Sequence, residues 1–220
     1  MGKKIECYID CVSPYSFHAF TYLQKNAAAL ESLNVEIEFI PVFLGGINVA
    51  SGNKPPWTLP AKAAYSKYDG QRAQKYFGQS FEIPPWFPIL SLLPQRSLTY
   101  IKKTYHKQKF EAAFKTCFET MWKGQLDISK PENLAQALGT VFDGKEVEDI
   151  IAAAGMPEVK AELAATTEKA VKELGAFGVP WFWVVNGEGK REPFFGSDRW
   201  HFMWEFLGLP FEDLKLKAKI

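Results

Sequence analysis

Residues 5–16 read I-E-C-Y-I-D-C-V-S-P-Y-S, an apolar run that ends in Ser13-Pro14-Tyr15-Ser16. The run Ile5–Val12 predicts a strand, and the residues after the turn are apolar at helical spacing. A strand that passes into a helix in this way presents Ser13 at a helix N-terminus, where the helix dipole favours an anion. Ser13 is also an ordinary N-cap and Pro14 a favoured first helical residue, so the turn can equally be explained without any chemistry.

The two ends of the chain predict complementary parts of one sheet. The run Val35–Val42 is a second strand, which completes a β-α-β unit with a right-handed crossover. Near the other end, Trp181–Val185 and Arg191–Phe195 flank the glycine-rich turn 186–189, a pattern typical of a β-hairpin. A last helix is expected from Ser197 onward. The order β-α-β followed by β-β-α is the arrangement of the thioredoxin fold.

The middle of the chain lacks strand patterning and predicts helix after helix. The expected helices are Ala61–Phe77, Ser97–Lys123, Pro131–Val141, Lys145–Ala154 and Pro157–Leu174. We therefore predict an α/β fold in which a thioredoxin-like domain (β-α-β and β-β-α) is interrupted by a long all-helical insertion. The expected division is 1–56 with 175–220 for the thioredoxin-like domain and 57–174 for the insertion. The four-proline, apolar stretch Gly78–Pro94 cannot be one helix, and we expect it to cover the cleft or to pack on another subunit.

Composition excludes several classes of function. The chain has 220 residues, 26 basic and 25 acidic side chains and a formal charge of +1, so neither a nucleic acid nor a membrane surface is an expected partner. No stretch approaches the roughly 18 apolar residues of a membrane span, and the first residues lead into a strand without a signal sequence. Cys7, Cys11 and Cys117 lie in apolar patterns without metal spacing, so we expect free thiols in a reducing intracellular compartment.

The serines of the first turn indicate the chemistry of the site. Thioredoxin-like oxidoreductases place a Cys-x-x-Cys pair here, but this chain has Ser13 and Ser16, which cannot form a disulfide. A hydroxyl at this place can still donate a hydrogen bond to a thiolate that another molecule brings. The implied substrate is therefore a thiol, and Ser13 is the candidate catalytic residue.

The tripeptide Gly178-Val179-Pro180 lies directly before the first hairpin strand. Thioredoxin-like folds hold a cis-proline at this place, and the residue before it pairs with an extended peptide in the manner of an added strand. We therefore expect a cis Val179-Pro180 bond, and glutathione is a peptide of this kind. An ordinary trans bond that enters a strand is the alternative, and it is the commoner form in proteins.

Two further turns offer groups for the ends of such a peptide. In Gly196-Ser197-Asp198-Arg199, backbone N–H groups can bind a carboxylate and Asp198 can accept an ammonium group, whereas a capping role for Ser197 is the simpler alternative. In 51–56 (S-G-N-K-P-P), Asn53 offers amide groups, and Lys54 and Lys62 can meet a glycyl carboxylate. A plain loop explains this composition equally well. The three histidines are scattered and no metal site is predicted.

These four strings, S-P-Y-S at 13–16, S-G-N-K-P-P at 51–56, G-A-F-G-V-P at 175–180 and F-G-S-D-R at 195–199, resemble the kappa class of glutathione transferases along nearly the whole chain. The resemblance implies a homodimer, glutathione as cosubstrate and a thiolate stabilised by Ser13. It places Asn53, Val179, Ser197 and Asp198 at glutathione-contacting positions, with Pro180 beside them. It also places Asp69 and Arg199 within reach of the neighbouring subunit's site.

The implied activity is conjugation of the glutathione thiolate to small electrophiles, a detoxification reaction, and the same thiolate could reduce peroxides. The chain departs from the commonest pattern of the class at Phe17, His18, Trp57 and Trp181, so the electrophile is not predicted. Members of the class occur in mitochondria and peroxisomes, and the tail 218–220 (A-K-I) loosely resembles a peroxisomal address, with the cytoplasm as the other alternative.

Two other functions stay open at this stage. One is the glutathione-dependent isomerisation of 2-hydroxychromene-2-carboxylate, catalysed by a related class that also uses a serine. The other is a non-catalytic module that binds glutathione or another extended peptide by strand addition.

Overall fold

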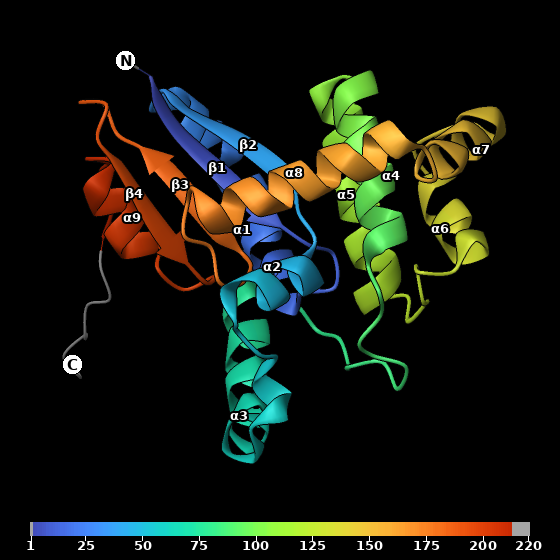
Figure 1. Cartoon of the computed structure of the whole chain (residues 1–220). Helices are drawn as coiled ribbons and strands as arrows, with labels where there is room; N and C mark the ends of the chain where they lie inside the picture. Colours follow the sequence, from blue (N-terminus) through green and yellow to red (C-terminus); the bar gives the residue numbers. More distant parts are fainter. Residues whose placement is uncertain (1, 213–220) are drawn as a thin grey trace.

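The structure of the protein is a computed structural model that describes residues 2–212 (Figure 1). The strands are β1 (Lys3–Ile9), β2 (Val35–Pro41), β3 (Trp181–Val185) and β4 (Arg191–Phe195). The helices are α1 (Pro14–Ser32), α2 (Leu44–Ser51), the 3-10 turn η1 (Pro56–Thr58), α3 (Pro60–Phe77), α4 (Leu92–Thr104), α5 (Lys107–Trp122), α6 (Pro131–Leu138), α7 (Gly144–Ala153), α8 (Pro157–Lys172) and α9 (Trp200–Phe206). This is the α/β class that the sequence predicts.

The four strands form one mixed sheet in the order β2-β1-β3-β4. β1 pairs with β2 in parallel, so Lys3 lies opposite Val35, and it pairs with β3 in antiparallel, so Lys4 lies opposite Val185. The hairpin of β3 and β4 then completes the sheet in antiparallel. The β-α-β unit and the β-β-α unit are therefore joined along β1 and β3, as the predicted thioredoxin arrangement requires.

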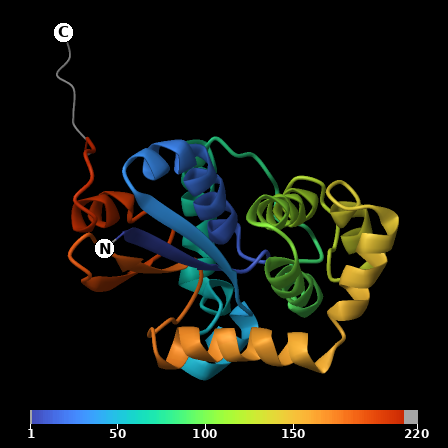
Figure 2. The same ribbon diagram turned by 90° about the horizontal axis from the view of Figure 1, so that it is seen from above.

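Alternate side chains of the sheet enter two apolar layers, because successive residues of a strand point to opposite faces. Ile5, Cys7 and Ile9 of β1 belong to the main core with α1 and α9, whereas Tyr8 belongs to a smaller cluster that includes residues of α2 and α8. Figure 2 shows the sheet between these helices, with the helices α4 to α7 to one side of it. The sheet is thus covered on both faces.

The helical segment shares its core with the sheet. The Phe20 ring of α1 lies 5.9 Å from Phe114 and 5.5 Å from Phe118 of α5, and the Trp122 indole donates a hydrogen bond to the carbonyl of Cys11 at 3.0 Å. One continuous apolar core joins the sheet and the helical segment, so packing alone does not separate them into two domains. The expected domain boundaries at 57 and 174 stay a prediction.

Several bounds differ from the sequence prediction: α4, for example, begins at Leu92 rather than Ser97, and α6 ends at Leu138 rather than Val141. The first strand ends at Ile9 rather than Val12, because residues 10–13 turn into α1. The last helix begins at Trp200 rather than Ser197. The single helix expected for Ser97–Lys123 is two helices, since Tyr105 and His106 are extended and the His106 ring accepts a hydrogen bond from the Lys109 amide at 3.4 Å.

Candidate active site

Ser13 caps α1. Its backbone is extended (φ −95°, ψ 119°), and its Oγ accepts a hydrogen bond from the Ser16 amide at 3.2 Å. The turn before it is closed by the Ser13 amide, which donates to the Asp10 carbonyl at 3.0 Å. The capping interpretation of this serine is therefore confirmed. The first turn of α1 has no acidic residue, whose negative charge would weaken the attraction of the helix N-terminus for an anionic ligand.

The Ser13 hydroxyl also reaches across to the other half of the chain. Its Oγ donates to the Val179 carbonyl at 3.3 Å, and both residues are nearly buried. The Val179-Pro180 peptide bond is cis, as the sequence predicts. The Gly196 amide donates to the Pro180 carbonyl at 3.1 Å, which holds the 196–199 turn against this loop. The structure thus brings the first, third and fourth strings of the sequence to one place. We call Ser13, Val179 and Pro180, together with Asn53 of the second string, the thiol site.

Asn53 belongs to this site through its side chain. Its Nδ2 donates to the Phe177 carbonyl at 2.6 Å, and its Oδ1 accepts from the Lys54 amide at 2.9 Å. The lack of a side chain at Gly178 leaves room for the Phe195 ring, because a Cβ at this position would lie 2.9 Å from that ring. The same Cβ would lie 3.8 Å from the Asn53 amide nitrogen. The second string therefore supports the loop that ends at Val179.

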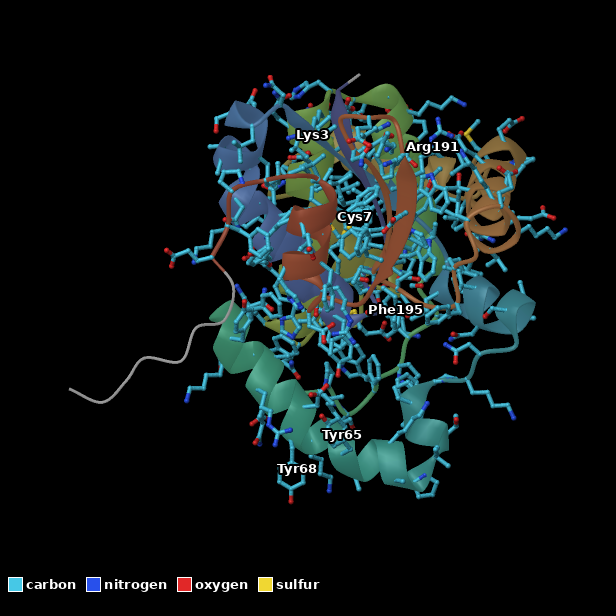
Figure 3. The ribbon with its side chains drawn as sticks, turned by 90° about the vertical axis from the view of Figure 1, so that its left-hand side faces the viewer. Lys3, Cys7, Tyr65, Tyr68, Arg191 and Phe195 are labelled. Carbon is cyan, nitrogen blue, oxygen red and sulfur yellow. The ribbon has the colours of Figure 1, made fainter. Side chains whose placement is uncertain are left out.

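Tyr15, which the sequence prediction did not assign to the site, faces two of the predicted acidic residues. Its hydroxyl donates to Asp69 at 3.5 Å, and Tyr65 donates to the other oxygen of Asp69 at 3.3 Å. Burial, and then the charges of Asp69 and Asp198, raise the pKa of Tyr15 to about 12. Asp69 therefore lies near the site of its own chain. Figure 3 shows Tyr65 on α3, beyond the end of β4 at Phe195.

The other predicted residues have different surroundings. Asp198 is exposed and accepts a hydrogen bond from Arg199 at 2.6 Å. Ser197 is buried and does not cap α9, whose flanking residue is Arg199, so the capping alternative is wrong. Lys62 is exposed in the first turn of α3. The assignment of these residues to glutathione stays a prediction.

The buried carboxylate of Asp10 is a second feature that the sequence prediction missed. It accepts hydrogen bonds from the amides of Val12 at 3.0 Å and Leu44 at 2.8 Å, and from the Ser91 hydroxyl at 2.7 Å. Burial raises the pKa of Asp10 to about 6, although these hydrogen bonds act in the opposite direction. Asp10 therefore ties the turn before Ser13 to the starts of α2 and α4.

His18 is a buried residue of α1. Its Nδ1 lies 2.5 Å from Oε1 of Gln79, and its ring stacks on Phe77 with the centroids 5.0 Å apart. Burial lowers the pKa of His18 to about 4, only partly offset by the Gln79 hydrogen bond. The imidazole is thus neutral and is no general acid near neutral pH.

The protein's own thiols are unsuited to nucleophilic chemistry. Cys7, Cys11 and Cys117 are all free and fully buried. Burial raises the pKa of Cys7 and Cys11 well above the ordinary range and that of Cys117 to about 12. Because the thiolate is the reactive form, a thiol that reacts at Ser13 has to come from another molecule.

Fold and site together define a thioredoxin-fold protein with serines in place of the redox cysteines. The chain belongs to the DsbA-like thioredoxin domain family, whose model matches residues 4–208. It is 29% identical over 211 residues to glutathione S-transferase kappa 1 of Caenorhabditis elegans, covering 94% of this chain and 92% of that protein. It is also 29% identical over 217 residues to the human protein of the same name, with the same coverage.

Solved structures support the fold. A 2-hydroxychromene-2-carboxylate isomerase superposes with a TM-score of 0.73 at 22% identity, covering 93% of this chain and 94% of that one. A probable DsbA oxidoreductase from Streptomyces coelicolor gives a TM-score of 0.71 at 17% identity, covering 98% of this chain and 94% of that one. The thioredoxin-like fold that the sequence predicts is confirmed. Within residues 2–212 no helix is long and apolar enough to cross a membrane.

Proposed function

We propose that this protein is a glutathione transferase of the kappa class, which conjugates the glutathione thiolate to small electrophiles. The observation that carries the proposal is the Ser13 hydroxyl at the N-terminus of α1, 3.3 Å from the Val179 carbonyl beside cis Pro180. The curated relatives named glutathione S-transferase kappa 1 support the same function.

The thiolate is stabilised by two effects at this place. A free thiol of pKa near 8.5 is mostly protonated at pH 7, and lowering its pKa by about two units requires about 2.7 kcal/mol. One hydrogen bond from a hydroxyl to an anion supplies about 1.5–3 kcal/mol, and the helix dipole about 0.3–1 kcal/mol. The hydroxyl of Ser13 and the uncharged first turn of α1 therefore suffice to keep bound glutathione largely ionised.

The peptide part of glutathione is held by the loops around Ser13. The Val179 N–H and C=O pair with its backbone in the manner of an added strand. The 196–199 turn holds the γ-glutamyl end, with Ser197 at the carboxylate and Asp198 at the ammonium group. Asn53 and Lys62 lie on the segment that meets the glycyl end of glutathione. Asp69 adds negative charge near the ammonium group of the γ-glutamyl end.

The electrophile binds beside the aromatic rings that adjoin the start of α1. Phe87 of the proline-rich stretch lies 5.2 Å from Trp57, which is half-exposed, while Phe17 is buried beneath Phe81 at 6.0 Å. Apolar aromatic surface of this kind favours flat, apolar electrophiles. Conjugation of such compounds is a detoxification reaction.

The test is a substrate panel in which glutathione consumption is followed. Consumption with a chloronitrobenzene-type electrophile or a peroxide, in step with product formation, supports the proposal. Turnover of 2-hydroxychromene-2-carboxylate without net consumption of glutathione would instead identify an isomerase. Saturable glutathione binding without turnover of any of these compounds would identify a binding module.

The proposal includes a homodimer in a reducing compartment, which the resemblance implies. The exposed side chains of Tyr65, Tyr68 and Tyr76 on α3, visible in part in Figure 3, are suited to contact a second copy. Sedimentation of the purified protein measures the assembly. The mitochondrion, the peroxisome and the cytoplasm stay open as locations, and the tail 218–220 lies outside the described residues.

A further inference from the structure

A cleft of about 340 Å³ lies between α2, α4 and α8, and none of the residues that line it belongs to the thiol site. Its wall is mostly apolar, from Phe43, Ala50, Leu92, Leu163 and Val171. Pockets for small molecules have volumes of about 300–1,000 Å³ and mostly apolar walls with a few polar groups. The cleft therefore has the size and lining of a small-molecule site.

The charges at the cleft are mainly positive. Arg96 of α4 and Lys160 of α8 both line it, and neither has an ion-pair partner among residues 2–212. Lys172, at the other end of the wall, is paired with Glu168. The cleft thus combines an apolar wall with uncompensated cationic groups, which favours an anion that carries an apolar body.

Arg96 is the group that selects the ligand. Its Nε is buried and has no hydrogen-bond partner within the described residues. A buried donor without an acceptor is unfavourable, and buried polar groups in folded proteins nearly always have a partner. The planar guanidinium matches a carboxylate through two parallel hydrogen bonds, which here come from the two terminal nitrogens because Nε is buried. The Thr167 hydroxyl in the same wall is already used, because it donates to Leu163 and accepts from Phe43.

We propose that this cleft binds a small amphipathic carboxylate, with the carboxylate on Arg96 and the apolar chain against Phe43, Leu92 and Leu163. Glutathione does not suit it, because glutathione is polar along its whole length and has no apolar body. The site is therefore distinct in place and in ligand class from the thiol site, and it is independent of the proposed function.

Calorimetric titration of the whole protein with octanoate tests this proposal. We expect one saturable octanoate site per chain. Octanol, which lacks the carboxylate, and acetate, which lacks the chain, should each bind at least tenfold more weakly. Arg96→Met keeps the length and apolar character of the side chain and removes its charge, so it should weaken octanoate at least tenfold. Arg191→Met, which removes an exposed arginine on β4, is the matched control and should bind octanoate like the wild type.

A second variant tests the cleft without touching Arg96. Ala164 is an exposed cleft residue of α8, so Ala164→Phe should fill the space, leave the fold intact and abolish octanoate binding. Circular dichroism checks the fold of each variant. Absence of octanoate binding to the wild type, unchanged binding in both variants, or displacement of octanoate by glutathione in one-to-one competition would each overturn the proposal.

Discussion

The Ser13 hydroxyl donates its hydrogen bond to the Val179 carbonyl at 3.3 Å while its oxygen accepts the Ser16 amide at 3.2 Å. The accepting role caps α1 and does not depend on a substrate. The donating role can be transferred, since the one hydroxyl proton can turn from the carbonyl to a thiolate that arrives beside it. The same residue therefore stabilises the helix and supplies a hydrogen bond for the reaction.

Replacement of Ser13 separates these roles. Ser13→Ala should raise the pKa of bound glutathione by about a unit or more, because a hydrogen bond to an anion contributes about 1.5–3 kcal/mol and one pKa unit corresponds to about 1.4 kcal/mol. Loss of the N-cap should also lower stability by about 0.5–2 kcal/mol. Thiolate absorbance at a series of pH values measures the first effect. Ser16→Ala is the control, since Ser16 Oγ is buried without a partner within the described residues. An unmoved midpoint in folded Ser13→Ala would contradict the role.

The charge of Asp198 should matter for glutathione affinity but not for ionisation of the thiol. Asp198→Asn should weaken glutathione binding by about 1.5–3 kcal/mol, the range for a hydrogen bond to a charged group. Calorimetry measures the affinity, and the thiolate spectrum at saturation should match that of the wild type. Glu192→Gln removes one exposed carboxylate from β4, the strand before the 196–199 turn, and should have little effect. Equal affinity of Asp198→Asn and the wild type would remove Asp198 from the site.

Asp10 should make the protein less stable as pH rises. Burial raises its pKa from 3.8 to about 6, so between these values the folded chain holds a proton that the unfolded chain has released. The stabilisation is complete below pH 3.8 and is lost as pH rises through about 6, by about 3 kcal/mol in total. His18 contributes the opposite dependence in the same range, so the slope of Asp10 appears as the difference in urea unfolding between the wild type and Asp10→Asn, whose stability should rise more steeply with pH. Glu36→Gln, at the exposed position of β2, should keep the wild-type dependence, and an unchanged slope in Asp10→Asn would contradict the assignment.

His18 should produce the opposite dependence. Burial lowers its pKa from 6.5 to about 4, so the unfolded chain binds the proton first as pH falls. This contribution is complete above pH 6.5 and is lost as pH falls towards 4, by about 3 kcal/mol. The variant His18→Phe should be less sensitive to acid in urea unfolding, whereas His201→Gln should follow the wild type. If both variants follow the wild type, His18 is not the titrating group.

Local patterns were enough to predict the sheet. The hairpin strands Trp181–Val185 and Arg191–Phe195 have the predicted bounds, because alternation and the glycine-rich turn between them are features of neighbouring residues. The meeting of Ser13 with Val179 followed from the fold that these patterns imply. The cis Val179-Pro180 bond followed from the same layout.

Helix α2 could not be predicted, because Gly45 and Gly46 are poor helix formers. Tertiary contacts explain both the helix and the glycines. The Leu44 amide is bonded to Asp10 and the Phe43 amide to Thr167, which fixes the start of the helix. A Cβ at Gly45 would lie 2.6 Å from the Phe43 ring. The contact of Tyr15 with Asp69 was missed because it too is a tertiary contact. The sequence around either residue contains no pattern that indicates the other as its partner.

The pairing of β1 with β3 has a consequence for synthesis of the chain on the ribosome. Residues 4 and 185 are sheet partners, so nearly the whole polypeptide has to be made before the central strand can find its second neighbour. Contacts within the helical segment are shorter in sequence and form earlier, because closing a long loop is entropically costly. The growing chain therefore exposes one edge of β1 until the last hairpin emerges. A molecule that stops before Gly178 has Ser13 but lacks Val179, the residue whose backbone would align a peptide substrate.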